Sequence, residues 1–156
     1  MPINMQDDIQ GEQLTESFED CKLQAYWDAT GKVWTIGWGH TGPEVVEGLV
    51  WTQAQCDAQL LVDRRAAVAC VNRNVNVPLT KNEFRALVDW VFNAGCGHFV
   101  GSTMLRLLNA GDYHGAAAEI DKWIFSGGVK LAGLLRRRQA ETAMFEQPDT
   151  SSGSQV

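Results

Sequence analysis

Three residues near the start of the chain, Glu19, Asp28 and Thr35, have side chains suited to breaking a glycosidic bond. That reaction needs a protonated carboxylic acid for the leaving oxygen and a second group that stabilises or attacks an oxocarbenium-like transition state from the other side. Glu19 follows Phe18, and partial burial there would favour the protonated form that a general acid requires. Asp28 lies in a polar turn and would stay ionised. The hydroxyl of Thr35 could position a water molecule opposite the leaving group, which favours inversion at the anomeric carbon.

The same side chains also have ordinary structural interpretations. Most acidic and hydroxyl side chains are solvated surface groups or helix caps. Asp28 fits the first position of a β-turn that uses Gly31. Residue type and spacing alone therefore leave the catalytic and the structural interpretation open.

The secondary structure expected around these residues can bring them together. Hydrophobic periodicity predicts a helix over residues 8–20, and the aromatic and β-branched stretch 23–39 predicts short strands joined by a tight turn. Glu19 then lies at the end of the helix, Asp28 at the far end of the first strand and Thr35 on the return strand. A helix end that faces a hairpin can place all three side chains around one cleft.

The rest of the chain is predicted to be helical, with each start marked by a capping residue. The expected helices start at the capping boxes Thr52/Gln55 and Thr80/Glu83, run from Ser102 through Leu108 and from Asp112 through Trp123, and cover residues 131–145. Apolar residues at helical spacing are expected to face the core, among them Cys56, Leu60, Ala67 and Val71 in the first of these helices and Phe84, Leu87, Val88, Val91 and Phe92 in the second. Trp90 and Trp123 are also expected within helices, in the core.

This order of elements predicts an α+β fold, in which a small antiparallel sheet lobe and a mainly helical lobe enclose a cleft. With 156 residues and 45% hydrophobic content, the chain can bury one sizeable core. We expect residues 1–148 to form a single domain and the polar residues 149–156 to be a disordered tail.

Charge and hydropathy exclude several classes of partner. The net charge is −6, and residues 1–20 contain six acidic and no basic side chains, so the rest of the chain is nearly neutral. The sequence lacks the basic stripe of a nucleic-acid-binding protein and any apolar run long enough to span a membrane. The N-terminus does not resemble a signal peptide, so we expect another component to carry or release a protein that acts outside the cytoplasm.

The cysteines and histidines do not have the spacing of a metal site. There is no C-x-x-C pair, and His40, His98 and His114 are too widely separated for a zinc motif, so we expect no metal and no cofactor. Cys56 and Cys70 fall on apolar helical positions, where a buried free thiol is the commoner state. Four cysteines allow three pairings, and the sequence does not choose among them.

Two further motifs are expected to be structural. Residues 37–42 fit G-x-G-x-x-G, but Pro43 follows where a dinucleotide-binding unit needs a helix, so nucleotide binding is not expected. The run Arg136-Arg137-Arg138 lies in a predicted helix, where consecutive side chains point in different directions. One of the three is expected to reach a carboxylate near the cleft and the others to stay in solvent.

The stretch 18–41 resembles the catalytic region of phage-type lysozymes, the endolysin family of glycoside hydrolases (glycoside hydrolase family 24). That family reads F-E-G-x-x-L-x-A-Y-x-D, then a glycine-containing turn, then W-T-I-G-Y-G-H-T. This chain has Phe18-Glu19-Asp20, Leu23, Ala25-Tyr26, Asp28 and Gly31, followed by W-T-I-G-W-G-H-T at 34–41. Later segments match in the same order, V-P-L-T at 77–80, F-N-A-G at 92–95, S-T-M-L at 102–105, L-N-A-G-D-Y at 108–113 and G-L-L-R-R-R-Q-A-E at 133–141. The resemblance covers residues 14–146.

The resemblance implies roles for individual residues. Glu19 matches the general acid, Asp28 the second catalytic carboxylate and Thr35 the threonine that orients water. Near the cleft, the positions that match substrate-binding residues are His40, Thr41, Phe92 and Asn93. In the family, a histidine like His40 often has a structural role instead, bonded to a carboxylate on a neighbouring helix.

Two residues beside Glu19 also differ from the family or bear on its regulation. Asp20 replaces the usual glycine. Its carboxylate could favour protonation of Glu19 or point into solvent, and we expect it to point into solvent. Some variants of the family regulate themselves through cysteines near the cleft. For Cys21 we expect a thiol without such a role.

The resemblance implies an endolysin muramidase that hydrolyses the β-1,4 bond between N-acetylmuramic acid and N-acetylglucosamine in peptidoglycan and so lyses the host cell. We expect a monomer that is made in the bacterial cytoplasm, is released through the membrane by a pore-forming protein and acts on the cell wall in the periplasm. A binding module with a dead site, a zinc amidase and a lytic transglycosylase are the alternatives. The intact trio argues against the first, histidine and cysteine spacing against the second, and the presence of Asp28 and Thr35 against the third.

Overall fold

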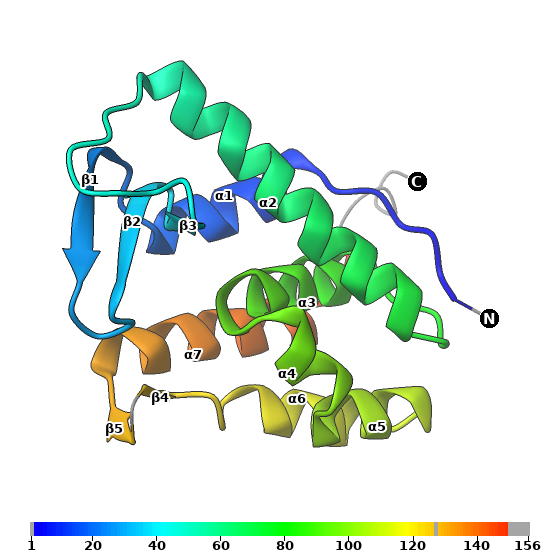
Figure 1. The fold of residues 1–156 in the computed structure, drawn as a ribbon. Helices are drawn as coiled ribbons and strands as arrows, with labels where there is room; N and C mark the ends of the chain where they lie inside the picture. Colours follow the sequence, from blue (N-terminus) through cyan, green and yellow to red (C-terminus); the bar gives the residue numbers. More distant parts are fainter. Residues whose placement is uncertain (1, 127, 150–156) are drawn as a thin grey trace.

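A small antiparallel sheet and a set of packed helices make up the structure, a computed structural model that describes residues 2–126 and 128–149 (Figure 1). The helices are α1 (Ile9–Phe18), α2 (Gln53–Asn74), α3 (Lys81–Ala94), α4 (Cys96–Val100), α5 (Thr103–Asn109), α6 (Tyr113–Ile120) and α7 (Ala132–Glu146). The strands are β1 (Lys22–Asp28), β2 (Val33–Gly37), β3 (His40–Thr41), β4 (Phe125–Ser126) and β5 (Val129–Lys130). The predicted order of helix, sheet and helical lobe is confirmed.

The sheet has the order β1-β2-β3, with antiparallel neighbours. The turn between β1 and β2 begins at Asp28, whose side-chain Oδ1 accepts hydrogen bonds from the backbone N–H groups of Thr30 (3.0 Å) and Gly31 (3.2 Å). An aspartate that caps its own turn in this way fixes the hairpin register. The expected turn role of Asp28 is therefore real, and it leaves Oδ2 outside these two bonds.

Helix α2 leads from the sheet to the helical lobe and runs diagonally across the upper part of Figure 1. It begins with the predicted capping box, in which Thr52 and Gln55 exchange hydrogen bonds between side chain and backbone. Cys56, Leu60, Ala67 and Val71 are buried on one face, as the spacing predicts.

Helix α3 is the centre of the helical lobe and packs against α1, α2 and α7. It begins with the second predicted capping box, formed by Thr80 and Glu83. Phe84, Leu87, Val88 and Val91 of its core face are buried as expected, whereas Phe92 is only partly buried; fully buried Trp90 is the largest side chain of the helix. Each fully buried Leu, Val or Phe side chain of α3 contributes about 1.5–3 kcal/mol, so the packing of α3 against its neighbours is a main source of stability of the lobe.

The region after α6 differs from the prediction. The helix ends at Ile120, so Trp123 lies outside any helix, and the short hairpin β4–β5 follows before α7. The Trp123 ring instead packs edge-on against Trp90, with centroids 5.6 Å apart, and lies 4.5 Å from the ring of His98. The expectation of a helix through Trp123 was wrong because the chain leaves the helix at its C-cap Asp121, and the aromatic contacts then hold the partly buried Trp123 side chain against the core. Helix α4 was also not predicted.

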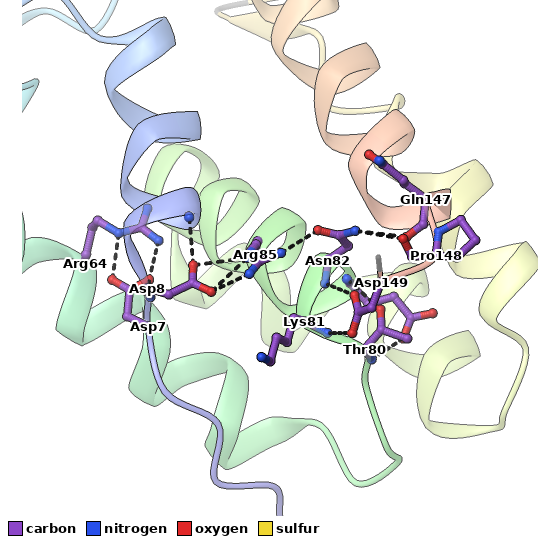
Figure 2. A network of polar contacts seen from close by, with 12 residues as sticks. Asp7, Asp8, Arg64, Thr80, Lys81, Asn82, Arg85, Gln147, Pro148 and Asp149 are labelled. Carbon is purple, nitrogen blue, oxygen red and sulfur yellow. Dashed lines mark hydrogen bonds and ion pairs between the residues drawn. The ribbon is translucent and has the colours of Figure 1, made fainter. Parts of the chain in front are cut away.

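Ion pairs tie the N-terminal segment to the helices, as Figure 2 shows. Asp7 binds Arg64 of α2 through two hydrogen bonds of 2.7 and 2.8 Å. Asp8 caps α1 through the N–H of Gly11 and binds Arg85 of α3 at 2.6 Å. The N-terminal segment, residues 2–8, is therefore bound to α2 and α3 at the point where α1 begins.

The end of the described chain is held at the start of α3. The carboxylate of Asp149 accepts hydrogen bonds from the backbone N–H groups of Lys81 (2.9 Å) and Asn82 (3.0 Å) (Figure 2). An anion at a helix N-terminus satisfies free N–H groups and interacts favourably with the helix dipole. The rest of the predicted tail, residues 150–156, lies outside the described residues.

The cysteines are in different states. Cys70 of α2 and Cys96 of α4 form a disulfide, with Cα atoms 6.0 Å apart, whereas Cys21 and Cys56 are free. The expected buried free thiol is confirmed for Cys56 and wrong for Cys70, because the unpredicted helix α4 places Cys96 against α2. In the described residues, no helix combines the length and the hydropathy needed to cross a membrane.

Candidate active site

Glu19 is the residue at which α1 stops. Its backbone is extended, and its N–H donates to the carbonyl of Thr15, which closes the last turn of the helix. The carboxyl group is 18% exposed and turns toward the helical lobe, where Nη1 of Arg137 donates to Oε2 at 2.6 Å. The other oxygen, Oε1, lies against the backbone of Gly39. Glu19 thus has one oxygen held by a cation and one directed toward the loop after β2.

Asp28 and Thr35 lie on the hairpin that faces this helix end. Tyr26 and Thr35 are cross-strand partners, and Asp28 is two residues further along β1. Burial raises the pKa of the Tyr26 phenol, and the negative charges of Asp28 and Glu19 raise it further. The side chain of Thr35 is buried, and its hydroxyl donates to the backbone carbonyl of Val33 at 3.3 Å.

Two pockets lie around the hairpin; Asp28 lines one of them, and Glu19 and Thr35 line neither. The larger, of about 550 Å³, lies between the tip of the β1–β2 hairpin and the helical lobe. Its walls include Asp28, Asn93, His98, Trp123, Phe125 and Arg138. The smaller, of about 210 Å³, is lined by Gly39, His40, Thr41, Asp63 and Phe92. The four predicted substrate-binding residues are therefore divided between two pockets, Asn93 in one and the other three in the second.

His40 has both ring nitrogens engaged by carboxylates. Nδ1 lies 2.8 Å from Oδ2 of Asp63 on α2, and Nε2 lies 2.7 Å from Oε2 of Glu44. Burial lowers the pKa of His40, but the hydrogen bonds to the two carboxylates outweigh it and the net pKa is raised. This arrangement favours the structural role over direct contact with a sugar.

A buried polar cluster in the helical lobe holds Arg137, the residue that binds Glu19. Arg137 uses Nε and Nη2 to bind both oxygens of Asp89, at 2.9 and 2.8 Å, and its guanidinium carbon lies 5.6 Å from the centre of the Phe18 ring. The expectation that one arginine of the 136–138 run reaches inward is confirmed by Arg137. The expectation that the others stay in solvent is right for Arg136 and wrong for Arg138, which is 1% exposed because it pairs with Glu141.

Asp89 is the residue of the site that sequence reasoning missed. It is fully buried on α3, between core residues Val88 and Trp90, and its Oδ1 also accepts from the hydroxyl of Thr15 at 2.7 Å. A charged residue inside an apolar helical stretch requires a partner of opposite charge, and that is the signal that could have found it. Asp20, as expected, is exposed.

No group of three or more histidine, cysteine or acidic side chains arranged to hold a metal ion occurs in residues 2–126 and 128–149. The chemistry available from the described site is that of two carboxyl groups, a buried hydroxyl and an arginine. These groups can donate a proton, stabilise a developing positive charge and orient a water molecule.

Comparison with known proteins gives a consistent result. The model of the phage lysozyme family matches residues 16–141. An endolysin of Acyrthosiphon pisum secondary endosymbiont phage 1 is 42% identical over 137 residues, which cover 85% of this chain and 92% of that protein. A SAR-endolysin of Escherichia phage Mu is 40% identical over 127 residues, which cover 81% of this chain and 73% of that protein.

The solved structures agree with the fold prediction. The muramidase domain of SpmX from Asticaccaulis excentricus superimposes with a TM-score of 0.83 and 37% identity, over 93% of this chain and all of that one. The predicted α+β, lysozyme-like architecture is confirmed by this likeness together with the observed three-stranded sheet and helical lobe.

Proposed function

The chain belongs to the phage lysozyme family, and on that premise we propose that Glu19, Asp28 and Thr35 hydrolyse the β-1,4 bond between N-acetylmuramic acid and N-acetylglucosamine. As a member of this family the chain is a glycoside hydrolase, an endolysin that acts on bacterial peptidoglycan. The observation that supports the assignment is the Glu19 carboxyl group at the end of α1, which has one oxygen bonded to Arg137 and the other against Gly39 in the loop after β2. The same sheet carries Asp28 and Thr35, the second carboxyl group and the hydroxyl that glycoside hydrolysis requires.

Glu19 is the general acid in this proposal. Arg137 occupies Oε2, so Oε1, which faces Gly39, is the oxygen that can carry a proton toward the substrate. The proton passes from Oε1 to the glycosidic oxygen as the bond between that oxygen and the anomeric carbon breaks. The leaving sugar departs as an alcohol, and Glu19 is left as a carboxylate.

Asp28 and Thr35 act from the other side of the sugar ring. Asp28 directs one oxygen to its own turn and has the second for the positive charge that develops on the ring. The hydroxyl of Thr35 orients the attacking water. The water oxygen bonds to the anomeric carbon, its proton passes to Asp28, and the configuration is inverted.

The two pockets supply the binding surface for the glycan strand. Trp123 and Phe125 give the larger pocket aromatic faces on which the apolar faces of sugar rings can pack, and Asn93 adds an amide for their hydroxyl and acetamido groups. We assign Thr41 and Phe92 to substrate binding in the smaller pocket. We assign His40 to holding the wall of that pocket through its two carboxylate partners.

The experiment that tests the proposal is analysis of the fragments released from purified peptidoglycan. Reducing ends are expected, with the α configuration at the new anomeric centre. Fragments with 1,6-anhydro ends would instead show a transglycosylase, and the absence of fragments would show a binding module.

Variants assign the residues in the same assay. Glu19→Gln should lower turnover by about 10²–10⁴-fold, the usual contribution of general acid catalysis. Asp20→Asn, which alters the exposed neighbouring carboxylate, is the matched control and should stay near wild type. Thr35→Ala should be severely impaired, and Thr35→Ser should recover part of the loss. Full activity of Glu19→Gln would remove the assignment of the acid, and near-normal rates for Thr35→Ala would remove the water-positioning role.

We further propose that residues 1–148 act as one monomeric domain, made in the cytoplasm of an infected bacterium and released to the cell wall through a pore-forming protein. The support is that its relatives are named endolysins. Light scattering tests the monomer. Expression with and without a pore-forming protein tests the route, since rapid lysis without the pore former would contradict it.

A further inference from the structure

Two carboxyl groups in the helical lobe have no part in the reaction proposed above. Asp89 on α3 and Glu141 on α7 are both completely buried. Ionised carboxylates are costly in a protein interior unless they are paired, so each of them must be explained by its contacts.

Asp89 holds the edge of Arg137 that faces away from Glu19. Nε and Nη2 of the guanidinium bind the two Asp89 oxygens side by side, which is the geometry of a bidentate pair. This contact fixes the plane of the guanidinium, so that Nη1 alone points at Glu19. Thr15 donates a third hydrogen bond to Asp89 from α1.

Glu141 lies beside Asp89 but has a different environment. Its Oε2 accepts from Nη2 of Arg138 at 2.7 Å and lies 3.9 Å from Nε of Arg137. Its Oε1 is buried and has no donor directed at it among the described residues. An oxygen that lacks a donor and lies next to a carboxylate is satisfied if it carries a proton and donates it.

The proton is expected on Glu141 and not on Asp89. Burial raises the pKa of Glu141 well above its usual range, and the neighbouring charge of Asp89 raises it further. Burial also opposes ionisation of Asp89, but hydrogen bonds from Glu141, Arg137 and Thr15 outweigh it, and the net pKa of Asp89 is lowered. Two adjacent buried carboxyl groups commonly divide their protons in this way.

Asp89 is then the buried anion that faces the cations Arg137 and Arg138, while Glu141 is neutral. From α2, Arg64 reaches the same group only through the hydroxyl of Thr15, and its charge is paired with Asp7. On the hairpin side, the charges of Asp28, Glu19 and Asp20 all raise the pKa of the Tyr26 phenol.

We propose that Asp89 is a positioning residue for the general acid, because it holds Arg137 with Nη1 toward Glu19 and offsets part of its positive charge, and that a protonated Glu141 keeps Asp89 in place by donating to it. The inference rests on the proposed role of Glu19. Without the negative charge of Asp89, Arg137 would favour the ionised form of Glu19 more strongly. Activity that depends on protonated Glu19 would then be lost at lower pH.

The test is the pH dependence of kcat/KM on purified cell walls. Asp89→Asn should move the alkaline limb of the kcat/KM profile to lower pH by about one unit, since the substitution removes a negative charge at hydrogen-bond distance from Arg137. Glu141→Gln should leave the limb in place, because an amide copies the shape and the donor of a protonated acid. The matched control is Glu146→Gln at the exposed end of α7.

The outcomes separate this inference from the proposed function. An inactive Glu19→Gln with an unmoved limb in Asp89→Asn would overturn the inference alone. A downward shift in Glu141→Gln would show that Glu141 is ionised and would also overturn it. Activity in Glu19→Gln would instead refute the proposed general acid.

A second measurement uses the wild-type protein, so it does not depend on whether Asp89→Asn folds. With ¹³C-labelled glutamate carboxyl groups, NMR at about pH 7 should show one resonance with the chemical shift of a protonated acid. This pH is far above the range in which ordinary glutamate side chains titrate. The resonance should disappear in Glu141→Gln. If every glutamate resonance is that of a carboxylate, Glu141 is ionised and the proposal fails.

Discussion

The backbone of Gly39 lies against the carboxyl group of Glu19, at a place where no side chain fits. A Cβ at this position would overlap Oε1 of Glu19, and the glycine has a φ of +80°, in the region that other residues rarely adopt. The glycine of the loop after β2 thus determines where the free oxygen of Glu19 can sit.

Gly39→Ala should therefore impair catalysis more than it impairs folding. The backbone strain costs about 1–3 kcal/mol, and the added methyl group displaces the acid as well. We expect kcat to fall by at least about tenfold, since small displacements of a catalytic group are costly. Gly48→Ala is the control, because Gly48 has a φ of +89° and nothing within 4 Å of an added Cβ. If Gly39→Ala is as stable as Gly48→Ala and keeps the wild-type kcat, the contact between Gly39 and Glu19 does not affect catalysis.

Arg137 connects the site to the core, and its removal should destabilise the whole protein. In Arg137→Gln, buried Asp89 loses its cation, and breaking a buried pair costs about 3–5 kcal/mol. Chemical denaturation measures the loss, and exposed Arg136→Gln is the control within the same helix. A free energy of unfolding equal in the two variants would mean that the pair contributes nothing to stability.

The sequence predicted the local elements of the site well because they depend on near neighbours. The end of the first helix, the turn that Asp28 caps and the aromatic and β-branched composition of β2 are short-range features, and they place Glu19, Asp28 and Thr35. The family resemblance then supplied the roles that spacing left open.

Long-range contacts could not be predicted in the same way. Asp89 and Arg137 are 48 positions apart, and Glu19 and Arg137 are 118 apart, so no local pattern links them. Trp123 was expected in a helix because the stop signal used for that helix, Gly127-Gly128, follows it in the sequence. Its real position depends on Trp90 and His98, which come from another part of the chain.

His40 should make stability depend on pH in a defined direction. Its pKa in the folded protein lies above the ordinary value of 6.5, so its protonated form stabilises the fold. That contribution is complete below about pH 6.5 and is lost as the pH rises through the folded-state value. The difference in Tm between wild type and His40→Asn should therefore be larger at about pH 6 than at about pH 8.5. Exposed His114→Asn is the control, and a difference that grows with pH would contradict the assignment.

The Cys70–Cys96 disulfide should stabilise the helical lobe without contributing to catalysis. It links α2 to α4 across a separation of 26 residues. Such a link lowers the entropy of the unfolded chain and so stabilises the fold by about 3 kcal/mol. The double variant Cys70→Ala/Cys96→Ala should therefore lower Tm by roughly 10 °C, as should reduction of the wild type. Cys21→Ser is the control for loss of a thiol outside the bridge, and should respond to reductant as the wild type does. Because neither bridged cysteine lines the two pockets, kcat at a temperature where all variants are folded should stay near wild type. A Tm that reductant does not change would show that the disulfide has no share in stability.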